Sequence, residues 1–372
     1  NTVVSHPTKH KTRLLVIHSH RSRMKLTVTT ATLLTVSFLQ GSSVLAWIVS
    51  QRKHHLHPTS LSASPRQGGV ANFPISVRAA LIEKAKQLDD NLSKGKTSGS
   101  YSPRGWSNRL GTVLTPAAIP GVYTADRPFY WNNIDVGCRM TVIQLEGGDL
   151  WVHSPVQLDQ PLKDSLKKLG TVKYIVSPNY EHLKYAAQWH QSYPEAFMWG
   201  CPGLAEKLPE IQWAGEVPSH CTGPTTSSLE DCWDFGTISP VHLDMEVNPF
   251  TGKPFFNEVI YYHAPSKTLL TTDLYWNYPT PDGVPNSHLG GSEWELAPAV
   301  DSIPFGSRLW KNGMDKVYLP FFKNFMVKDR SRYDEIVNVI LDKWDIETVI
   351  PAHGDIIRGK ELVRSVLSKH LR

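Results

Sequence analysis

Acidic residues are absent from the first 82 positions of this 372-residue sequence. The first acid is Glu83, whereas the stretch before it holds ten Lys or Arg and seven of the sixteen His. From residue 83 onward, acids outnumber bases by 34 to 29, so the net charge of +5 comes from the leading stretch. A protein that binds nucleic acid would carry a basic patch in its folded part. We therefore expect no nucleic-acid partner.

Cysteine is scarce and widely spaced. The four thiols are Cys138, Cys201, Cys221 and Cys232, and no CxxC pair occurs among them. A disulfide scaffold is not expected in a chain of this length, and a Cys-rich zinc ribbon is excluded. We expect four free, partly buried thiols, with a thiol beside a site (Cys201 or Cys221) as the alternative.

The leading stretch lacks an apolar run that is long enough to span a membrane comfortably. Met24 and Lys25 are followed by an apolar run at 26–39 and by Val44-Leu45-Ala46, the pattern of a signal peptide over about 24–46. The basic, acid-free stretch to residue 67 has transit-peptide composition. Together they resemble the two-part presequence of diatoms and related algae. We expect residues 1–67 to be a disordered targeting leader for the plastid, with secretion or an N-terminal membrane anchor as alternatives and no stable span in the mature chain.

Downstream of the leader, residues 68–111 are expected to form a helix (73–91) and a linker (93–107), and residues 112–372 a mixed α/β domain. Hairpins come first and strands alternate with helices later, apart from a proline-rich excursion at 278–304. Expected strands are 140–145, 150–153, 172–176, 196–199, 258–263, 268–272, 317–319 and 347–350. Expected helices are 161–169, 183–190, 203–208, 333–344 and 360–371.

Side chains of the metal-binding type follow three of these strands. Glu181 and His182 come after the strand at 172–176, Asp273 after the second hairpin, and His353 after the strand at 347–350. Two imidazoles and one or two carboxylates would suit one divalent ion of zinc, iron or manganese. Taken singly, each residue is more often a cap or a solvated side chain, so the prediction depends on the strand ends converging.

Several segments resemble the DUF4336 family, a divergent branch of the metallo-β-lactamase fold, over roughly residues 123–371. These segments are Leu150-Trp151-Val152-His153-Ser154-Pro155, Ser177-Pro178-Asn179 with His182, Trp189 with Tyr193-Pro194, Glu258-Val259-Ile260-Tyr261-Tyr262-His263 and Leu270-Thr271-Thr272-Asp273. The resemblance implies a four-layer αββα sandwich and a C-terminal metal-binding histidine in Pro351-Ala352-His353-Gly354.

The same resemblance implies an incomplete metal loop. The fold's His-x-His-x-Asp-His motif falls on residues 177–182, where Ser177 and Asn179 replace the two leading histidines and Glu181 replaces the aspartate. The third histidine of the first metal site has at best His242 as a counterpart. What remains is the second set of ligands, which implies one metal ion or none.

Two functions stay open at this stage. The first is a one-metal hydrolase of an ester, thioester, amide or phosphoester, in which the ion lowers the pKa of water to about 7. The second is a non-catalytic binding or regulatory protein with a vestigial metal site, because Glu181 is one carbon longer than aspartate. The partner would be an unknown small-molecule substrate or a protein. His153 is expected to contact the metal loop or to pack in the core, and Asp355 to support His353 or to act as a cap.

Overall fold

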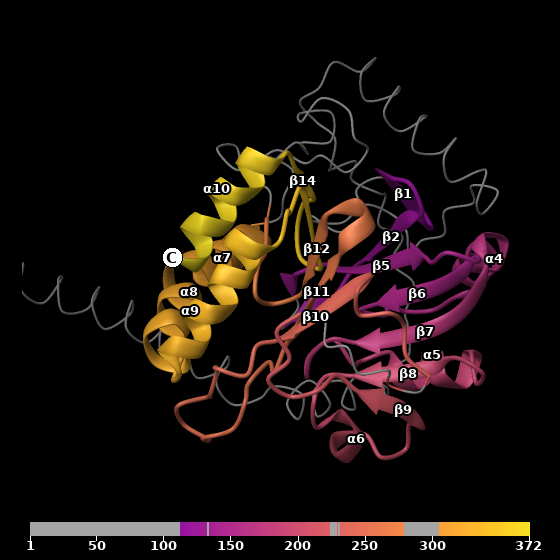
Figure 1. Ribbon diagram of the computed structural model, residues 1–372, viewed down its shortest axis with the longest axis horizontal. Helices are drawn as coiled ribbons and strands as arrows, with labels where there is room; N and C mark the ends of the chain where they lie inside the picture. The colour runs from indigo at the N-terminus through magenta and orange to yellow at the C-terminus, as the bar shows by residue number, and fades with distance from the viewer. Residues whose placement is uncertain (1–111, 132–133, 224–228, 230, 279–304) are drawn as a thin grey trace, which may run out of the picture.

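The computed structural model describes residues 112–131, 134–223, 229, 231–278 and 305–372 (Figure 1). The expected targeting leader, the helix at 73–91 and the linker at 93–107 lie outside these residues. All of the proline-rich excursion except Tyr278 also lies outside them.

The larger of two mixed sheets has seven strands in the order β1-β2-β5-β6-β7-β8-β9. Its first four strands are antiparallel neighbours, and β6 to β9 run parallel to one another. The strands are β1 (Thr115–Ile119), β2 (Val122–Arg127), β5 (Cys138–Gln144), β6 (Asp149–His153), β7 (Thr171–Ser177), β8 (Phe197–Gly200) and β9 (Trp213–Glu216). A separate two-stranded ribbon pairs β3 (Tyr130–Trp131) with β4 (Ile134–Asp135).

The second sheet has five strands in the order β10-β11-β12-β13-β14. Its pairs are antiparallel except β12 with β13, which are parallel. The strands are β10 (Ile238–His242), β11 (Val259–His263), β12 (Thr268–Thr271), β13 (Thr348–Pro351) and β14 (Ile357–Arg358). A short 3₁₀ turn, η2 (Ala264–Ser266), joins β11 to β12.

Helices cover the outer face of each sheet, α4 and α5 on one side of the molecule and α7 to α10 on the other (Figure 1). The first group is α4 (Gln160–Leu169) and α5 (Ala186–Ser192), and the short helix α6 (Leu204–Lys207) lies between β8 and β9 in the chain. The second group is α7 (Phe305–Gly313), η4 (Met314–Tyr318), α8 (Leu319–Phe321), η5 (Phe322–Met326), α9 (Arg330–Asn338), η6 (Val339–Lys343) and α10 (Lys360–Leu371), where η4, η5 and η6 are π-helical turns.

Three hydrophobic clusters fill the layers. One packs α4 and α5 on the larger sheet, one packs α7 to α10 on the smaller sheet, and the third lies between the sheets. Strand β7 contributes to two of them, because Ile175 faces the helices while Tyr174 and Val176 face the other sheet. This explains why its sequence is almost continuously apolar rather than alternating.

Local sequence chemistry accounts for the boundaries of α4. The carboxylate of Asp159 accepts the backbone N–H of Leu162 at 3.1 Å, and Pro161 stands in the first turn. Both are typical of a helix start. Lys167 and Lys168 in the last turn complement the negative end of the helix dipole.

Most of the expected elements of the folded part are confirmed within a few residues, including both hairpins and the strand that precedes His353. The expected strand at 317–319 is wrong, because these residues continue from the π-helical turn η4 into α8. A short apolar run cannot be assigned to strand or helix by its periodicity alone. The four cysteines are free, as expected. No helix among the described residues is long and apolar enough to cross a membrane.

Candidate metal centre

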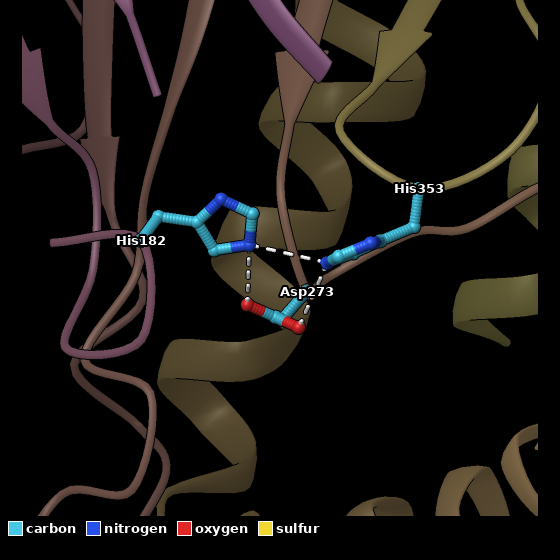
Figure 2. A group of neighbouring side chains, drawn as sticks. All are labelled: His182, Asp273 and His353. Atoms are coloured by element: carbon cyan, nitrogen blue, oxygen red, sulfur yellow. Dashed lines mark hydrogen bonds and ion pairs between the residues drawn. The ribbon is translucent and has the colours of Figure 1, made fainter. Parts of the chain in front are cut away.

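The ends of three strands bring His182, Asp273 and His353 together (Figure 2). His182 lies in the loop after β7 of the larger sheet, whereas Asp273 and His353 follow β12 and β13 of the smaller sheet. β12 and β13 are parallel neighbours, so their carboxyl ends share one edge of the sheet. The three side chains are 6 to 11% exposed.

The spacing of their polar atoms suits a common cation. His182 Nε2 lies 3.1 Å from His353 Nε2 and 3.4 Å from Asp273 Oδ2, and His353 Nε2 lies 3.7 Å from Asp273 Oδ1. Ligands bound to zinc at about 2.0–2.1 Å in a tetrahedral arrangement would be about 3.3 Å apart. The donor set of two imidazoles and a carboxylate therefore fits a divalent ion in both chemistry and spacing.

His353 is held in the tautomer that a metal ligand needs. Its Nδ1 lies 2.8 Å from the carbonyl oxygen of Gly137, which can only accept, so Nδ1 carries the hydrogen. Burial lowers the pKa of His353 to about 4, so the ring is neutral near pH 7. Its Nε2 lone pair therefore faces His182 and Asp273, and the three side chains are called the cluster below. Hydrogen bonding of the distal ring nitrogen to a backbone carbonyl is usual for metal-binding histidines.

His182 is anchored through its other ring nitrogen as well. Its Nδ1 lies 2.7 Å from Ser154 Oγ and 3.8 Å from Cys138 Sγ. Burial alone would lower the pKa of His182, but Cys138 and Asp273 raise it well above its usual value. The Nε2 atoms of His182 and His353 lie 3.1 Å apart, so they either share a proton or face a common cation. Either arrangement requires the same orientation of the two rings.

Asn179 organises the loop that presents His182. Its Nδ2 donates to Asp273 Oδ2 at 2.6 Å and to Thr272 Oγ1 at 3.0 Å. Its Oδ1 accepts the backbone N–H groups of Glu181 and His182 at 2.9 and 2.8 Å. Although the resemblance placed Asn179 where a ligand had been lost, its side chain now connects two of the candidate ligands.

Glu258 fixes the backbone of the loop that carries Asp273. Its buried carboxylate accepts the N–H groups of Thr272, Asp273 and Leu274 at 2.6, 2.9 and 2.7 Å. Burial, and then the charge of Asp273, raise the pKa of Glu258 to about 7. The direction in which the Asp273 side chain leaves the strand therefore depends on this one carboxyl group.

Arg139 fastens the His353 loop to the larger sheet. Its Nη1 donates to the carbonyl oxygens of Pro351 and Gly354 at 2.9 and 2.6 Å. The other nitrogens of the guanidinium bind both carboxylate oxygens of Asp126 at 2.7 and 3.0 Å. Because Arg139 is 5% exposed, this buried ion pair fixes the position of one sheet against the other beside the cluster.

Glu181 is the fourth predicted ligand, and it is not in the group of converging ligand atoms. It lines the pocket beside the cluster instead. Burial, and then the nearby charge of Asp273, raise the pKa of its carboxyl group to about 7. The structure thus brings together three of the four predicted ligands and places the fourth on the wall of the pocket.

Other residues that the sequence singled out lie apart from the converging atoms. His242 Nε2 pairs with Asn257 Oδ1 at 2.9 Å, so it does not replace the missing histidine. His153 is buried in the core, stacked on Trp151 with ring centroids 5.8 Å apart, and burial lowers its pKa to about 3. The partner of His353 Nδ1 is Gly137 rather than Asp355.

A pocket opens to the surface beside His182, Asp273 and His353. His182, Asp273 and His353 form part of its wall, together with Glu181 and Cys138. The rest of the wall is mainly aromatic and aliphatic. The arrangement can therefore bind a ligand whose polar group meets the histidines while its apolar part lies in the pocket.

Sequence reasoning missed the supporting residues Arg139, Ser154 and Glu258. Two of them had a signal in the sequence, because Arg139 is the one charged residue of β5 and Glu258 directly precedes β11. Buried charged groups require partners, so such positions indicate an internal network.

Residues 121–286 match the model of a family described as a domain of unknown function, DUF4336. The structure is similar to that of DIM-1 metallo-β-lactamase exposed to ceftazidime, with 15% identity, a TM-score of 0.37, and coverage of 68% of this chain and 90% of that chain. It is also similar to a metallo-β-lactamase from Pontibacter korlensis, with 11% identity, a TM-score of 0.39, and coverage of 68% and 93%.

A third similar structure is the Flv1 flavodiiron core from Synechocystis sp. PCC6803, with 11% identity, a TM-score of 0.44, and coverage of 72% of this chain and 62% of that chain. No curated protein matches the chain significantly in sequence. The family match therefore covers residues 121–286, and the described residues form an α/β fold of two mixed sheets.

Proposed function

We propose that the domain binds one divalent metal ion through His182 Nε2, His353 Nε2 and a carboxylate oxygen of Asp273. The observation that supports this most strongly is the spacing of 3.1 to 3.7 Å between these atoms, with Nε2 of His353 left as an acceptor by the bond to Gly137. Three protein ligands and an open position are typical of catalytic rather than structural zinc sites.

We further propose that the domain is a metal-dependent hydrolase of an ester, thioester, amide or phosphoester. A bound ion would supply a Lewis acid at the wall of the pocket. Asn179 and Glu258 hold Asp273 in place, Ser154 holds His182, and the Glu181 carboxyl group, with a pKa of about 7, can accept or donate a proton beside the pocket. Zinc, iron and manganese are all compatible with this donor set.

Elemental analysis of the purified protein tests the first step. We expect about one equivalent of metal, with loss of most of it in both Asp273→Ala and His353→Ala. His242→Gln is the matched control, because His242 is also a buried histidine but lies outside the cluster. Metal-free protein after growth and purification with added zinc, iron or manganese would contradict the proposal and favour a vestigial site.

Hydrolysis is tested separately on the metal-loaded protein with a panel of chromogenic esters, thioesters, amides and phosphoesters. We expect turnover that a chelator abolishes and that added metal restores. Stoichiometric metal without turnover of any class in the panel would instead support the binding or regulatory alternative.

A further inference from the structure

We infer that the pocket beside the cluster holds the apolar acyl chain of a carboxylic acid derivative. The inference rests on the proposed hydrolase function. It limits the substrate class to esters, thioesters or amides of alkyl or arylalkyl acids and excludes phosphoesters. The carbonyl carbon would lie at the histidines and the chain along the apolar wall.

The composition of the wall supports an apolar occupant. Phe129, Phe255, Phe256, Trp310 and Met314 all line the pocket, on the side of the molecule where α7 and η4 pack against the smaller sheet. Pockets with this lining obtain most of their affinity from apolar burial, while a few polar groups orient the ligand. Here the polar groups of the wall include His182, Asp273 and His353, which converge at one place.

The aromatic walls are held in place by contacts of their own. Phe255 and Phe256 pack edge to face with ring centroids 4.7 Å apart. The indole Nε1 of Trp310 donates to the hydroxyl of Tyr278 at 2.9 Å, so its polar atom is already satisfied. An occupant therefore meets preformed apolar surfaces and has no donor of Trp310 to satisfy.

The charge of the wall argues against a phosphoester. Apart from the histidines, Lys184 is the one basic side chain among the described residues that line the pocket, and its Nζ lies 4.9 Å from the centroid of the Phe129 ring. Glu181 and Asp273 line the same wall and are acidic residues, not donors for a phosphate. Phosphate recognition usually employs several cationic or N–H donors, whereas a neutral acyl group needs none of them.

Two homologous series test the pocket and the metal separately. Straight-chain primary alcohols, from butanol to decanol, probe the apolar pocket without needing a metal ion. Straight-chain carboxylates of the same lengths are product analogues that use both the pocket and the ion. Affinity is measured by calorimetry with the zinc-loaded protein and with the chelated protein.

We expect the dissociation constant to fall about fourfold per methylene in both series until the pocket is filled, the value for complete burial of each CH₂ group. Added zinc should tighten the binding of carboxylates and leave that of alcohols unchanged. Octanoate esters should be hydrolysed at least tenfold faster than acetate esters, and faster than aryl phosphates.

Phe255→Ala should flatten the dependence on chain length in both series without changing zinc stoichiometry, because Phe255 lines the pocket and is only partly buried. Phe325→Ala is the matched control, since that ring is 57% exposed and does not line the pocket. We expect it to behave as the unsubstituted protein.

Alcohol affinity that is independent of chain length, or equal loss in Phe255→Ala and Phe325→Ala, would overturn the pocket assignment. Preferential hydrolysis of aryl phosphates would overturn the substrate class. A steep alcohol series in a protein that binds no metal would leave the pocket assignment standing while the proposed function fails.

Discussion

At the scale of single residues, Asn179 stands where the resemblance implies a lost metal ligand, yet its side chain still organises the site. Its amide donates to Asp273 at 2.6 Å and accepts two N–H groups of the loop that carries His182. Asparagine binds metals poorly, but its amide supplies donor and acceptor at once, and this loop uses both. Ser177 is the other position where the resemblance implies a lost histidine; it is buried, and its hydroxyl has no hydrogen-bond partner among the described residues.

Asn179→Asp is therefore expected to weaken zinc binding about 10- to 100-fold, the usual effect of losing a group that orients a metal ligand. The substitution keeps the acceptor but replaces the donor with a second carboxylate oxygen, which faces Asp273 Oδ2. Competition with a chromophoric chelator measures the affinity.

Ser177→Ala, at the end of β7 and two residues before Asn179, is the matched control. Because its hydroxyl is unpaired, we expect unchanged zinc affinity and a stability that is unchanged or increased by up to about 1 kcal/mol. Equal affinities for zinc in the unsubstituted protein and Asn179→Asp would show that Asn179 does not position Asp273.

Glu246 makes stability depend on pH. Burial raises the pKa of its carboxyl group from 4.5 to about 7, although it accepts the N–H groups of Phe256 and Asn257 at 2.5 and 2.7 Å. The folded state thus binds this proton more tightly than the unfolded state. Its contribution is fully present below about pH 4.5 and is lost as the pH rises to about 7.

Glu246→Gln should remove this dependence, since the amide oxygen can still accept from the backbone but the group no longer ionises. Between pH 5 and pH 8 we expect the unsubstituted protein to lose about 1 to 3 kcal/mol more than the variant. Urea unfolding at several pH values measures the difference. Parallel stability curves would show that Glu246 does not hold a proton in the folded state.

At the scale of elements, the loop between β13 and β14 depends on a glycine. Gly354 has a φ of +90°, and a Cβ atom there would lie 2.2 Å from the backbone of Asn277. The two segments are joined by hydrogen bonds from Asn277 N to His353 O at 3.0 Å and from Asp355 N to Asn277 O at 2.7 Å. Close approach of two backbones thus fixes the direction of His353.

Gly354→Ala should destabilise the protein by about 1 to 3 kcal/mol through backbone strain and by a further 1 to 3 kcal/mol through overlap with Asn277. Gly359→Ala is the control, because Gly359 has a φ of +100° but open space where its Cβ would lie. It should show the strain alone and retain zinc affinity. Equal losses in urea unfolding would show that the close approach to Asn277 is unimportant.

The elements were largely predictable because their signals are local. An apolar run and a turn at Gly147-Gly148 each act within a few residues, so β6 and β7 could be assigned from the sequence. The run at 317–319 failed because strand and buried helix share its pattern. Of the site, the strand-end ligands could be proposed, but their convergence depends on Arg139 and Glu258, whose partners are distant in sequence.

At the scale of the whole molecule, one prediction concerns residues 1–67, the expected targeting leader, which lies outside the described residues. A fluorescent protein fused behind this leader should enter the plastid of a diatom or related alga, because a signal peptide followed by a transit-like stretch is expected to act in two steps. Removing residues 24–46 should leave the fusion in the cytosol. Secretion of the intact fusion would instead favour the alternative of a plain signal peptide.

The placement of the candidate ligands on two sheets has a mechanical consequence. His182 follows a strand of the larger sheet, whereas Asp273 and His353 follow strands of the smaller one, and Arg139 of the larger sheet donates to the loop that carries His353. A shift of one sheet against the other would change the distance from His182 to His353 and leave the distance from Asp273 to His353 unchanged. The metal affinity would thus depend on how the two sheets pack against each other. Substitutions in the interface between the sheets, even far from the histidines, would first change the metal affinity.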